Sequence, residues 1–102
     1  MTGAPILIPD ARADVAAAFR WYEERAFGLG TEFLRCVEAV LLSIQRNPLI
    51  HPVVHEAYRR ALVRRFPFAI FFEIDPVQNR CIICAVFHCA RSPDKWRDRV
   101  PG

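Results

Sequence analysis

The chain has 102 residues, of which 53% are hydrophobic and 25% are charged, and its formal net charge is +3. This length and composition suit one domain with its own core, which excludes an intrinsically disordered protein. The apolar runs are too short to span a membrane, and the first residues lack the basic start and long apolar run of a signal peptide. The sequence therefore predicts a cytoplasmic protein with a single domain over residues 1–102.

The first elements expected along the chain are a short strand and a helix. Residues 5–8 are apolar and lie between prolines, which is typical of an edge strand. Residues 11–27 repeat apolar side chains at helical spacing, and Asp10 is the expected N-cap. Gly28 and Gly30 then interrupt the helical pattern.

A second amphipathic helix is expected over residues 31–47. Thr31 is the expected cap at its start, and Asn47 and Pro48 end it. Because few residues separate the two helices, they should form an antiparallel hairpin, and the apolar face of this hairpin needs a second layer.

The second half of the chain supplies that layer. Residues 49–56 are a loop or an irregular strand, and three strands are expected after them, at residues 58–66, 68–75 and 80–88. Ser92 and Pro93 should start a short C-terminal helix that carries Trp96. The order β-α-α-β-β-β-α predicts an α+β fold in which the helical hairpin packs on one face of an antiparallel sheet. The residues expected to be mostly buried are Phe33, Val37, Leu41, Phe72, Ile74 and Ile83.

Four arginines lie within seven residues: Arg59, Arg60, Arg64 and Arg65. On an extended strand, Arg59 and Arg65 share one face, and Arg60 and Arg64 share the other. Such a patch suits phosphate or carboxylate groups. Equally, charge on an edge strand protects against aggregation. Both interpretations stay open.

The sequence assigns no catalytic residue, but it offers candidates. Histidine titrates near neutral pH, so His88 at the end of the last strand could donate or accept a proton. Glu56 is a second candidate base. Among the 14 basic residues only Lys95 is a lysine, and arginine stays protonated, so arginines would act as cations rather than bases. The remaining candidates are Arg64, Arg65 and Arg91.

The sequence predicts no metal or cofactor site. Cys81 and Cys84 have CxxC spacing, but residues three apart on a strand face opposite sides, and no second pair has zinc-ribbon spacing. We interpret them as small apolar side chains in the sheet. His51 and His55 flank a proline and are not expected to bind a metal by themselves. Trp21 and Trp96 are interpreted as packing anchors.

Short motifs spread over nearly the whole length resemble the RelE/ParE superfamily of bacterial toxins. They keep the order and spacing of that superfamily and comprise Ala11-x-x-Asp14, Trp21 to Arg25, Gly28-Leu29-Gly30-x-x-Phe33-Leu34, Val37-Glu38, Ile44 with Asn47-Pro48, Arg59 to Phe68, and Val86 to Trp96. The resemblance implies the same β-α-α-β-β-β-α fold. It also implies the toxin of a type II toxin–antitoxin system, the kind of module that stabilises plasmids.

The superfamily contains two activities. RelE-like members cleave mRNA in the ribosome, where a ribose 2′-hydroxyl attacks the adjacent phosphate with help from acid–base and cationic residues. ParE-like members bind and inhibit DNA gyrase. The present chain has the arginines but lacks the C-terminal tyrosine of RelE-like members after Trp96, so the resemblance favours the ParE-like branch and a protein that is not an enzyme.

The resemblance further implies a protein partner. A cognate antitoxin would neutralise the toxin in a hetero-oligomer, through an amphipathic segment that folds on contact. Arg59, Arg60, Arg64 and Arg65 would then contact the target or the antitoxin. One alternative is a RelE-like mRNA interferase, an endoribonuclease that uses the arginines and His88 on the ribosome. Another is a domain that keeps the fold without toxicity.

Overall fold

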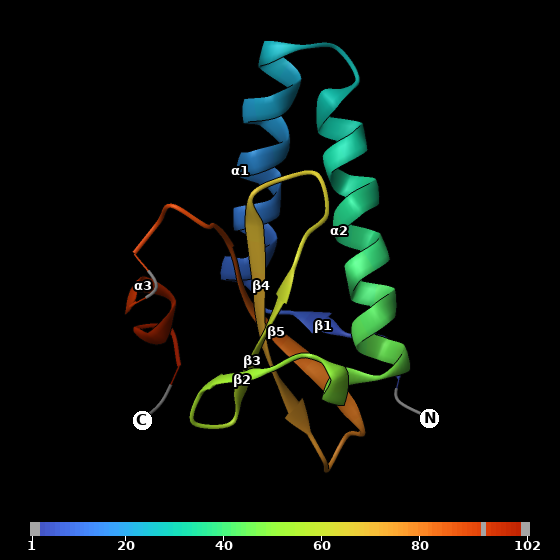
Figure 1. The fold of residues 1–102 in the computed structure, drawn as a ribbon, viewed down its shortest axis with the longest axis vertical. Helices are drawn as coiled ribbons and strands as arrows, with labels where there is room; N and C mark the ends of the chain where they lie inside the picture. Colours follow the sequence, from blue (N-terminus) through green and yellow to red (C-terminus); the bar gives the residue numbers. More distant parts are fainter. Residues whose placement is uncertain (1–2, 93, 101–102) are drawn as a thin grey trace.

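The computed structural model describes residues 3–92 and 94–100, and it shows a sheet between two unequal helical layers (Figure 1). A hairpin of two long helices covers one face, and a short C-terminal helix lies against the other. The predicted α+β fold, with a helical hairpin on one face of the sheet, is confirmed.

The sheet has five strands in the order β1-β5-β4-β3-β2. They are β1 (Ile6–Leu7), β2 (Val53–His55), β3 (Tyr58–Leu62), β4 (Phe68–Asp75) and β5 (Arg80–His88). Strands β2 to β5 form antiparallel pairs, but β1 pairs with β5 in parallel, so the sheet is mixed rather than wholly antiparallel. The segment expected to be a loop or irregular strand contains a 3₁₀ turn, η1 (Pro48–Ile50), and then β2.

Strand β3 ends four residues earlier than predicted because the chain bends to bury an aromatic ring. The ring of Phe66 lies 4.9 Å from that of Tyr22 and 5.4 Å from that of Phe33, between the two helices. Arg65 adopts a left-handed conformation with φ 71°, which turns the chain out of the strand direction. The bend thus places Phe66 in the helix-side core and separates the last arginines from the strand.

The first helix, α1 (Pro9–Arg25), begins one residue before its predicted cap. Asp10 therefore lies inside the helix, and Ile8 occupies the N-cap position without a side-chain hydrogen bond. Proline suits the first helical position because its φ is already helical and it has no N–H to satisfy. Among the described residues, no helix is both long enough and apolar enough to cross a membrane.

The start of the second helix, α2 (Leu29–Arg46), also differs from the prediction. Gly28 is its N-cap with φ 84°, so Thr31 lies within the first turns rather than at the cap. The two carboxylate oxygens of Glu23 accept the N–H groups of Gly28 and Gly30, each at 2.9 Å. A side chain from α1 therefore caps α2, and this contact fixes the hairpin turn. The predicted end is confirmed, since Asn47 is the C-cap.

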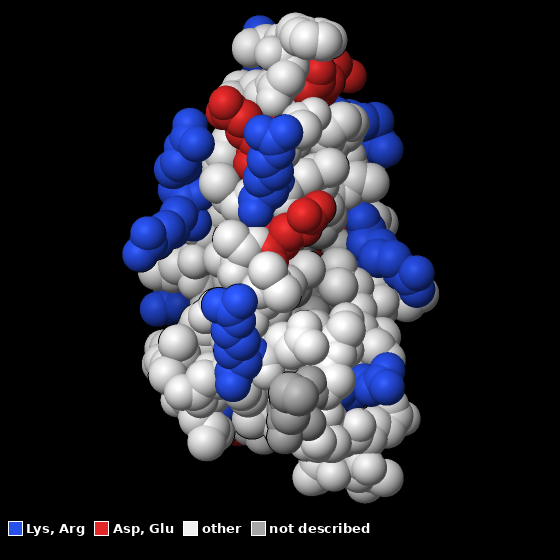
Figure 2. All heavy atoms as spheres, turned by 90° about the vertical axis from the view of Figure 1, so that its right-hand side faces the viewer, with Lys and Arg blue, Asp and Glu red and all other residues white. Residues whose placement is uncertain are grey.

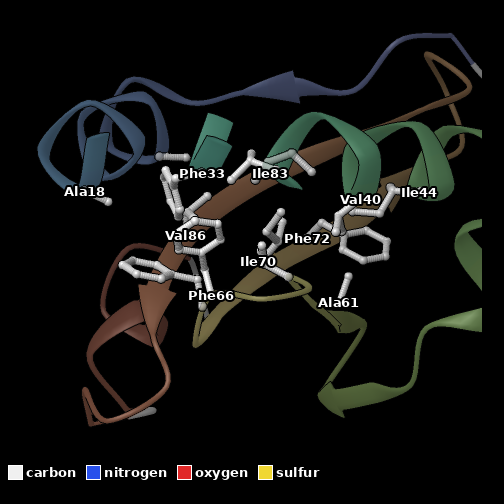
Figure 3. Close-up of a cluster of buried hydrophobic side chains, with 14 of the residues drawn as sticks. Ala18, Phe33, Val40, Ile44, Ala61, Phe66, Ile70, Phe72, Ile83 and Val86 are labelled. Carbon is white, nitrogen blue, oxygen red and sulfur yellow. The ribbon is translucent and has the colours of Figure 1, made fainter. Parts of the chain in front are cut away.

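The core between the hairpin and the sheet is continuous (Figure 3). Of the six residues predicted to be mostly buried, four are at most 3% exposed: Phe33, Val37, Phe72 and Ile83. Leu41 and Ile74 are only partly buried and pack at the margin of this core. Amphipathic periodicity thus found the interior face of the hairpin and sheet, including the residues at the margin of the core.

The second face of the sheet is covered by α3 (Asp94–Arg97) through one side chain. Trp96 is 1% exposed and stacks on Phe71, with ring centroids 4.5 Å apart and planes 15° apart. It also meets the ring of Tyr58 edge-on at 5.5 Å. The interpretation of Trp96 as a packing anchor is confirmed, whereas the expected role of Pro93 at the helix start lies outside the described residues.

Candidate functional site

The four arginines of the predicted patch do not lie together. Arg59 is half-buried, and its Nη1 donates to the carbonyl oxygen of His51 at 2.7 Å. Arg60 is exposed on the opposite face, the one on which α3 lies. Arg64 and Arg65 follow the end of β3, and Nη2 of Arg65 lies 3.4 Å from a carboxylate oxygen of Glu32 on α2.

The arginines are therefore divided between two faces of the sheet and the bend after β3. The expected alternation fails for Arg64 and Arg65 because the strand has already ended. On the face of the molecule that carries α2, the positive side chains are spread out and several acidic ones lie among them (Figure 2). The described residues of this face form no continuous basic patch.

The structure instead places Arg60 beside His88 and Arg91. These three side chains line a hollow on the face of the sheet that α3 leaves partly open. The other described residues that line this hollow are apolar or carry a thiol: Leu62, Ala69, Phe71, Phe87 and Cys89. We call this site the basic hollow. None of its described lining residues is acidic, so the lining contributes positive charge and no carboxylate.

A larger apolar cavity of about 360 Å³ adjoins the basic hollow. It lies between α1 and the end of β5, and its walls are mainly Ala17, Ala18, Trp21, Tyr22, Phe68 and Val86. Trp21 is 51% exposed, with the guanidinium of Arg25 3.5 Å from its ring centroid, so its interpretation as a buried packing anchor is wrong. His88 and Arg91 line both the cavity and the basic hollow.

The loop that carries these two shared side chains is held by local hydrogen bonds. Nδ1 of His88 accepts the N–H of Ala90 at 3.0 Å, and the carbonyl of His88 accepts the N–H of Arg91 at 2.9 Å. The guanidinium of Arg91 lies 3.7 Å from the ring centroid of Phe87. Because Nδ1 is an acceptor here, a neutral His88 ring carries its proton on Nε2.

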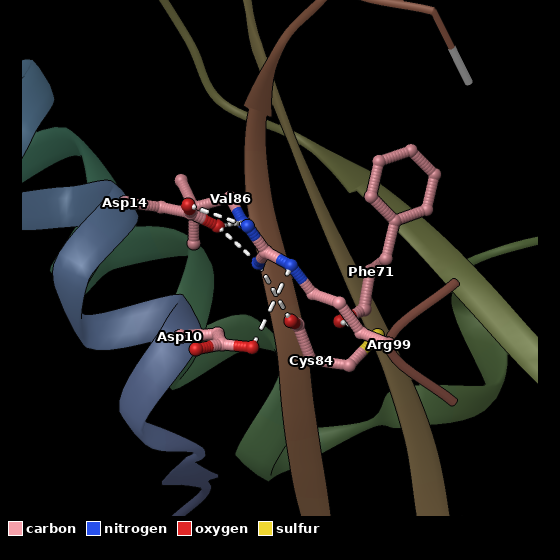
Figure 4. Close-up of polar contacts among 6 residues, drawn as sticks. All are labelled: Asp10, Asp14, Phe71, Cys84, Val86 and Arg99. Atoms are coloured by element: carbon pink, nitrogen blue, oxygen red, sulfur yellow. Dashed lines mark hydrogen bonds and ion pairs between the residues drawn. The ribbon is translucent and has the colours of Figure 1, made fainter. Parts of the chain in front are cut away.

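A partly buried ion pair closes the edge of β5 beside the cavity (Figure 4). Nη1 and Nη2 of Arg99 donate to the two carboxylate oxygens of Asp14 at 2.7 and 3.0 Å, in a bidentate arrangement. Arg99 also donates to the carbonyl of Cys84, and Asp14 accepts the N–H of Val86. The hydrogen bond to Asp14 raises the pKa of Arg99, which therefore stays charged.

The pair occupies positions that a neighbouring strand would fill. Strand β1 pairs only with Ile82 and Ile83, and Cys84 is an extra residue that has no partner opposite it in β4. This bulge directs the Cys84 carbonyl and the Val86 N–H toward Asp14 and Arg99. Side chains therefore satisfy backbone groups that the short β1 leaves unpaired.

Other candidate acid–base groups are poorly placed for catalysis. Burial and a nearby Glu73 raise the pKa of Tyr58 to about 12, so its phenol stays protonated at neutral pH. Burial raises the pKa of the Cys84 thiol to about 12, and this thiol donates to the carbonyl of Phe71. Glu56 lies in the turn after β2, with its carboxylate 4.0 Å from Nε2 of His55. None of these three groups lines the basic hollow.

Three further side chains that could bind a metal are packed against other residues instead: Cys81, Cys84 and His51. Cys81 lies in the core on the hairpin side and Cys84 in the cluster on the other face, as their spacing on one strand predicts. His51 lies beside Ser43, with Nε2 and Oγ 3.2 Å apart, and meets the ring of Phe72 edge-on. Within residues 3–92 and 94–100, no group of three metal-binding side chains occurs.

Sequence reasoning missed Arg99 and gave no role to Asp14, although it included Asp14 in the quoted motifs. The two residues are 85 positions apart in the sequence, and no local pattern connects positions at that separation. Arg60, His88 and Arg91 were all candidates, but the sequence did not predict that they share a hollow. Their proximity depends on the pairing of β3 with β4 and of β4 with β5.

Comparison with known proteins finds a solved structure of similar fold and no match by sequence. No family model and no curated protein matches the chain. A solved structure described as "Chromosomal ParDE TA system from P. aeruginosa" contains a chain of similar fold, with a TM-score of 0.70 and 16% sequence identity. The match covers 83% of the present chain and 94% of that chain. The fold is therefore one found in a ParDE toxin–antitoxin system.

Proposed function

We propose that this chain is the toxin of a type II toxin–antitoxin module, of the ParE-like branch, and that it acts by binding DNA gyrase. The observation that carries the proposal is the fold, which extends over most of both chains in the match to a component of a ParDE system. In the proposed module a cognate antitoxin, encoded by a neighbouring gene, binds the toxin in a hetero-oligomer and neutralises it.

The geometry of the open sheet face supports binding rather than catalysis. Arg60 and Arg91 supply positive charge, but arginine is a poor proton acceptor. His88 is the titratable group beside them, and its Nδ1 already accepts a backbone N–H. Tyr58, on the same face, remains protonated because its pKa is raised to about 12. A cationic contact surface is the simplest role for this arrangement.

One arrangement favours the alternative, a ribosome-dependent mRNA interferase. Two arginines and a histidine around one hollow could hold a phosphate and move a proton during attack by a 2′-hydroxyl. The two functions differ in what they require of His88. A general base contributes roughly 10²–10⁴-fold to a rate, whereas a binding surface tolerates the loss of one imidazole.

The test expresses the wild-type chain and the H88A variant separately and follows DNA supercoiling and mRNA integrity over time. We expect supercoiling to stop first with the wild type, and we expect H88A to keep most of this effect. Purified gyrase should be inhibited by both proteins. Circular dichroism and a denaturation midpoint serve as folding controls, because His88 lies edge-on to Phe68 with centroids 5.3 Å apart.

Two results would contradict the proposal. Ribosome-dependent mRNA cleavage by the wild type that disappears in a folded H88A variant would assign the chain to the interferases. The absence of both growth arrest and gyrase inhibition would favour a domain that keeps the fold without toxicity. Co-expression with the neighbouring gene tests the antitoxin separately, because a true antitoxin should form a complex and relieve the arrest.

A further inference from the structure

The apolar cavity between α1 and the end of β5 is bordered by aromatic rings that pack on one another. Trp21 meets Tyr22 edge-on, with ring centroids 5.1 Å apart. Tyr22 meets Phe68 edge-on at 6.1 Å, and Phe68 in turn meets the imidazole of His88 at 5.3 Å. All four side chains line the cavity, and we call the first three the aromatic wall. Because each ring packs against the next, this wall has a fixed shape.

The half-exposed indole of Trp21 is held in this wall by Arg25. The guanidinium lies 3.5 Å from the ring centroid, and Nη1 donates to the carbonyl oxygen of Trp21 at 3.0 Å. Arg25 is not among the described residues that line the cavity, so it covers a part of the indole that faces away from the cavity. Trp21 therefore presents a fixed aromatic surface to the cavity although half of the side chain is exposed.

The charged side chains that line the cavity leave it with unmatched positive charge. Asp14 lines the cavity, but both of its carboxylate oxygens accept hydrogen bonds from Arg99 (Figure 4). Arg91 has no such counterpart, since no carboxylate of the described residues forms an ion pair with it. A neutral His88 adds the proton on Nε2, because its Nδ1 already accepts a backbone N–H. The cavity thus offers two donors to a negatively charged group.

The volume and lining of the cavity indicate the size and class of the ligand. A water molecule occupies about 30 Å³ in the liquid, so a volume of about 360 Å³ corresponds to about a dozen groups of that size. Small-molecule sites combine apolar and aromatic walls with a few polar groups, as this cavity does. We propose that it binds a small molecule with one aromatic ring and one carboxylate, the ring against the aromatic wall and the carboxylate against Arg91 and His88. This ligand site goes beyond the proposed function and requires neither a toxin target nor an antitoxin.

The test titrates the ¹⁵N-labelled full chain with 3-phenylpropionate. The matched control is 3-phenylpropionamide, which has the same shape and no charge. We expect 3-phenylpropionate to shift the backbone amide signals of Ala17, Val86 and Arg91. The uncharged control should bind at the same residues about tenfold more weakly, because charge-assisted hydrogen bonds are lost. Hexanoate keeps the charge but lacks the ring, so it should bind about fivefold more weakly than 3-phenylpropionate.

Two pairs of variants make the result specific. R91Q should weaken binding of 3-phenylpropionate about tenfold and leave the uncharged control unchanged, whereas R64Q removes an exposed charge outside the cavity and should change neither. A17L adds bulk at an exposed helix position that lines the cavity, so it should weaken both ligands about tenfold. A13L adds the same bulk at an exposed position of α1 outside the cavity lining and should change neither. Circular dichroism checks that all four variants are folded.

Several outcomes would overturn the proposal. They are the absence of shifts at the cavity with 3-phenylpropionate, equal binding of hexanoate, equal weakening by R91Q and R64Q, and tighter binding of inorganic phosphate than of 3-phenylpropionate at the same residues. The last would assign Arg91 to an anion site that does not use the aromatic wall. These measurements are independent of gyrase inhibition and of relief of toxicity, so failure of this proposal is distinguishable from failure of the proposed function.

Discussion

The two faces of the sheet are covered in different ways. On one face, two helices of 17 and 18 residues enclose a continuous core in which Phe33, Phe72 and Ile83 are fully buried. On the other face, a helix of four residues contributes Trp96, and the rest of the face borders the basic hollow. Most of the apolar burial that stabilises the fold is thus on one side, which leaves the other side available for contacts.

The outer edge of β5 is also covered in two different ways. Backbone hydrogen bonds to β1 satisfy the edge at Ile82 and Ile83. Farther along, the side chains of Asp14 and Arg99 bind the backbone of Cys84 and Val86 instead. A strand buries its edge permanently, whereas a side-chain ion pair keeps the neighbouring space open. This space is the apolar cavity that Asp14, Val86 and His88 line.

The contrast between the faces predicts unequal effects of truncation, and the largest is expected in the helix-side core. Phe72 is fully buried, so F72A should lower the free energy of unfolding by about 3–5 kcal/mol. Leu62 is 60% exposed on the other face, and L62A should change the free energy of unfolding by no more than about 0.5 kcal/mol. Urea denaturation of both variants measures the difference. Similar losses would show that the two faces contribute equally.

The ion pair at the edge of β5 should give the next largest effect. In R99Q or D14N, one partner remains largely buried without its counter-charge, so each variant should lose about 2 kcal/mol of unfolding free energy. The double variant should lose less than the sum of the two, because both single changes break the same contact. The control, R65Q, breaks an exposed pair and should have a much smaller effect. Additive losses would show that the pair is not coupled.

Sequence periodicity predicted the helical hairpin, the three main strands and the face that the hairpin covers. These features depend on side chains that alternate or repeat over many residues, so small local errors average out. The end of β3 was not predictable in this way. It depends on Phe66 finding space between Tyr22 and Phe33, which is a property of the folded hairpin.

The sequence predicted which residues belong to the candidate site, but it did not predict how they are arranged in space. His88, Arg60 and Arg91 were recognised from residue type, because cationic and imidazole groups can bind anions. The prediction that the four arginines alternate between the two faces of one strand assumed a straight strand through Arg65, where the structure has a bend. The pairing of Asp14 with Arg99 had no sequence signal, since it joins an early helix to the end of the chain.

The cap of α2 was also not predictable from the local sequence, because Glu23 of α1 supplies it. This cap gives a further prediction. A Cβ at Gly30 would lie 2.7 Å from the carbonyl oxygen of Phe19, so G30A should cost about 1–3 kcal/mol, although alanine is the better helix former. T31A should be neutral or slightly stabilising, because Glu23 caps the helix and Thr31 does not. Thermal denaturation of the two variants tests this. A stabilised G30A protein would mean that the helices can separate at no cost.

The smallest effect concerns pH and depends on His51, whose ring lies beside Ser43 and Phe72. Burial, and secondarily the positive charge of Arg59, lower the pKa of His51 below its usual 6.5. As pH falls below about 6.5, the unfolded chain therefore takes up a proton at this position before the folded protein does. The contribution of His51 to stability is complete above that pH and declines as pH decreases toward its folded-state pKa.

Unfolding free energies at pH 5 and pH 8 measure this contribution in the wild type and H51Q. Other groups also titrate in this range, so the difference between variants is the informative quantity. H51Q should flatten the dependence, because the ring between Ser43 and Phe72 no longer has to stay neutral. Equal slopes for H51Q and the wild type would show that His51 accepts its proton as readily in the folded protein as in the unfolded chain.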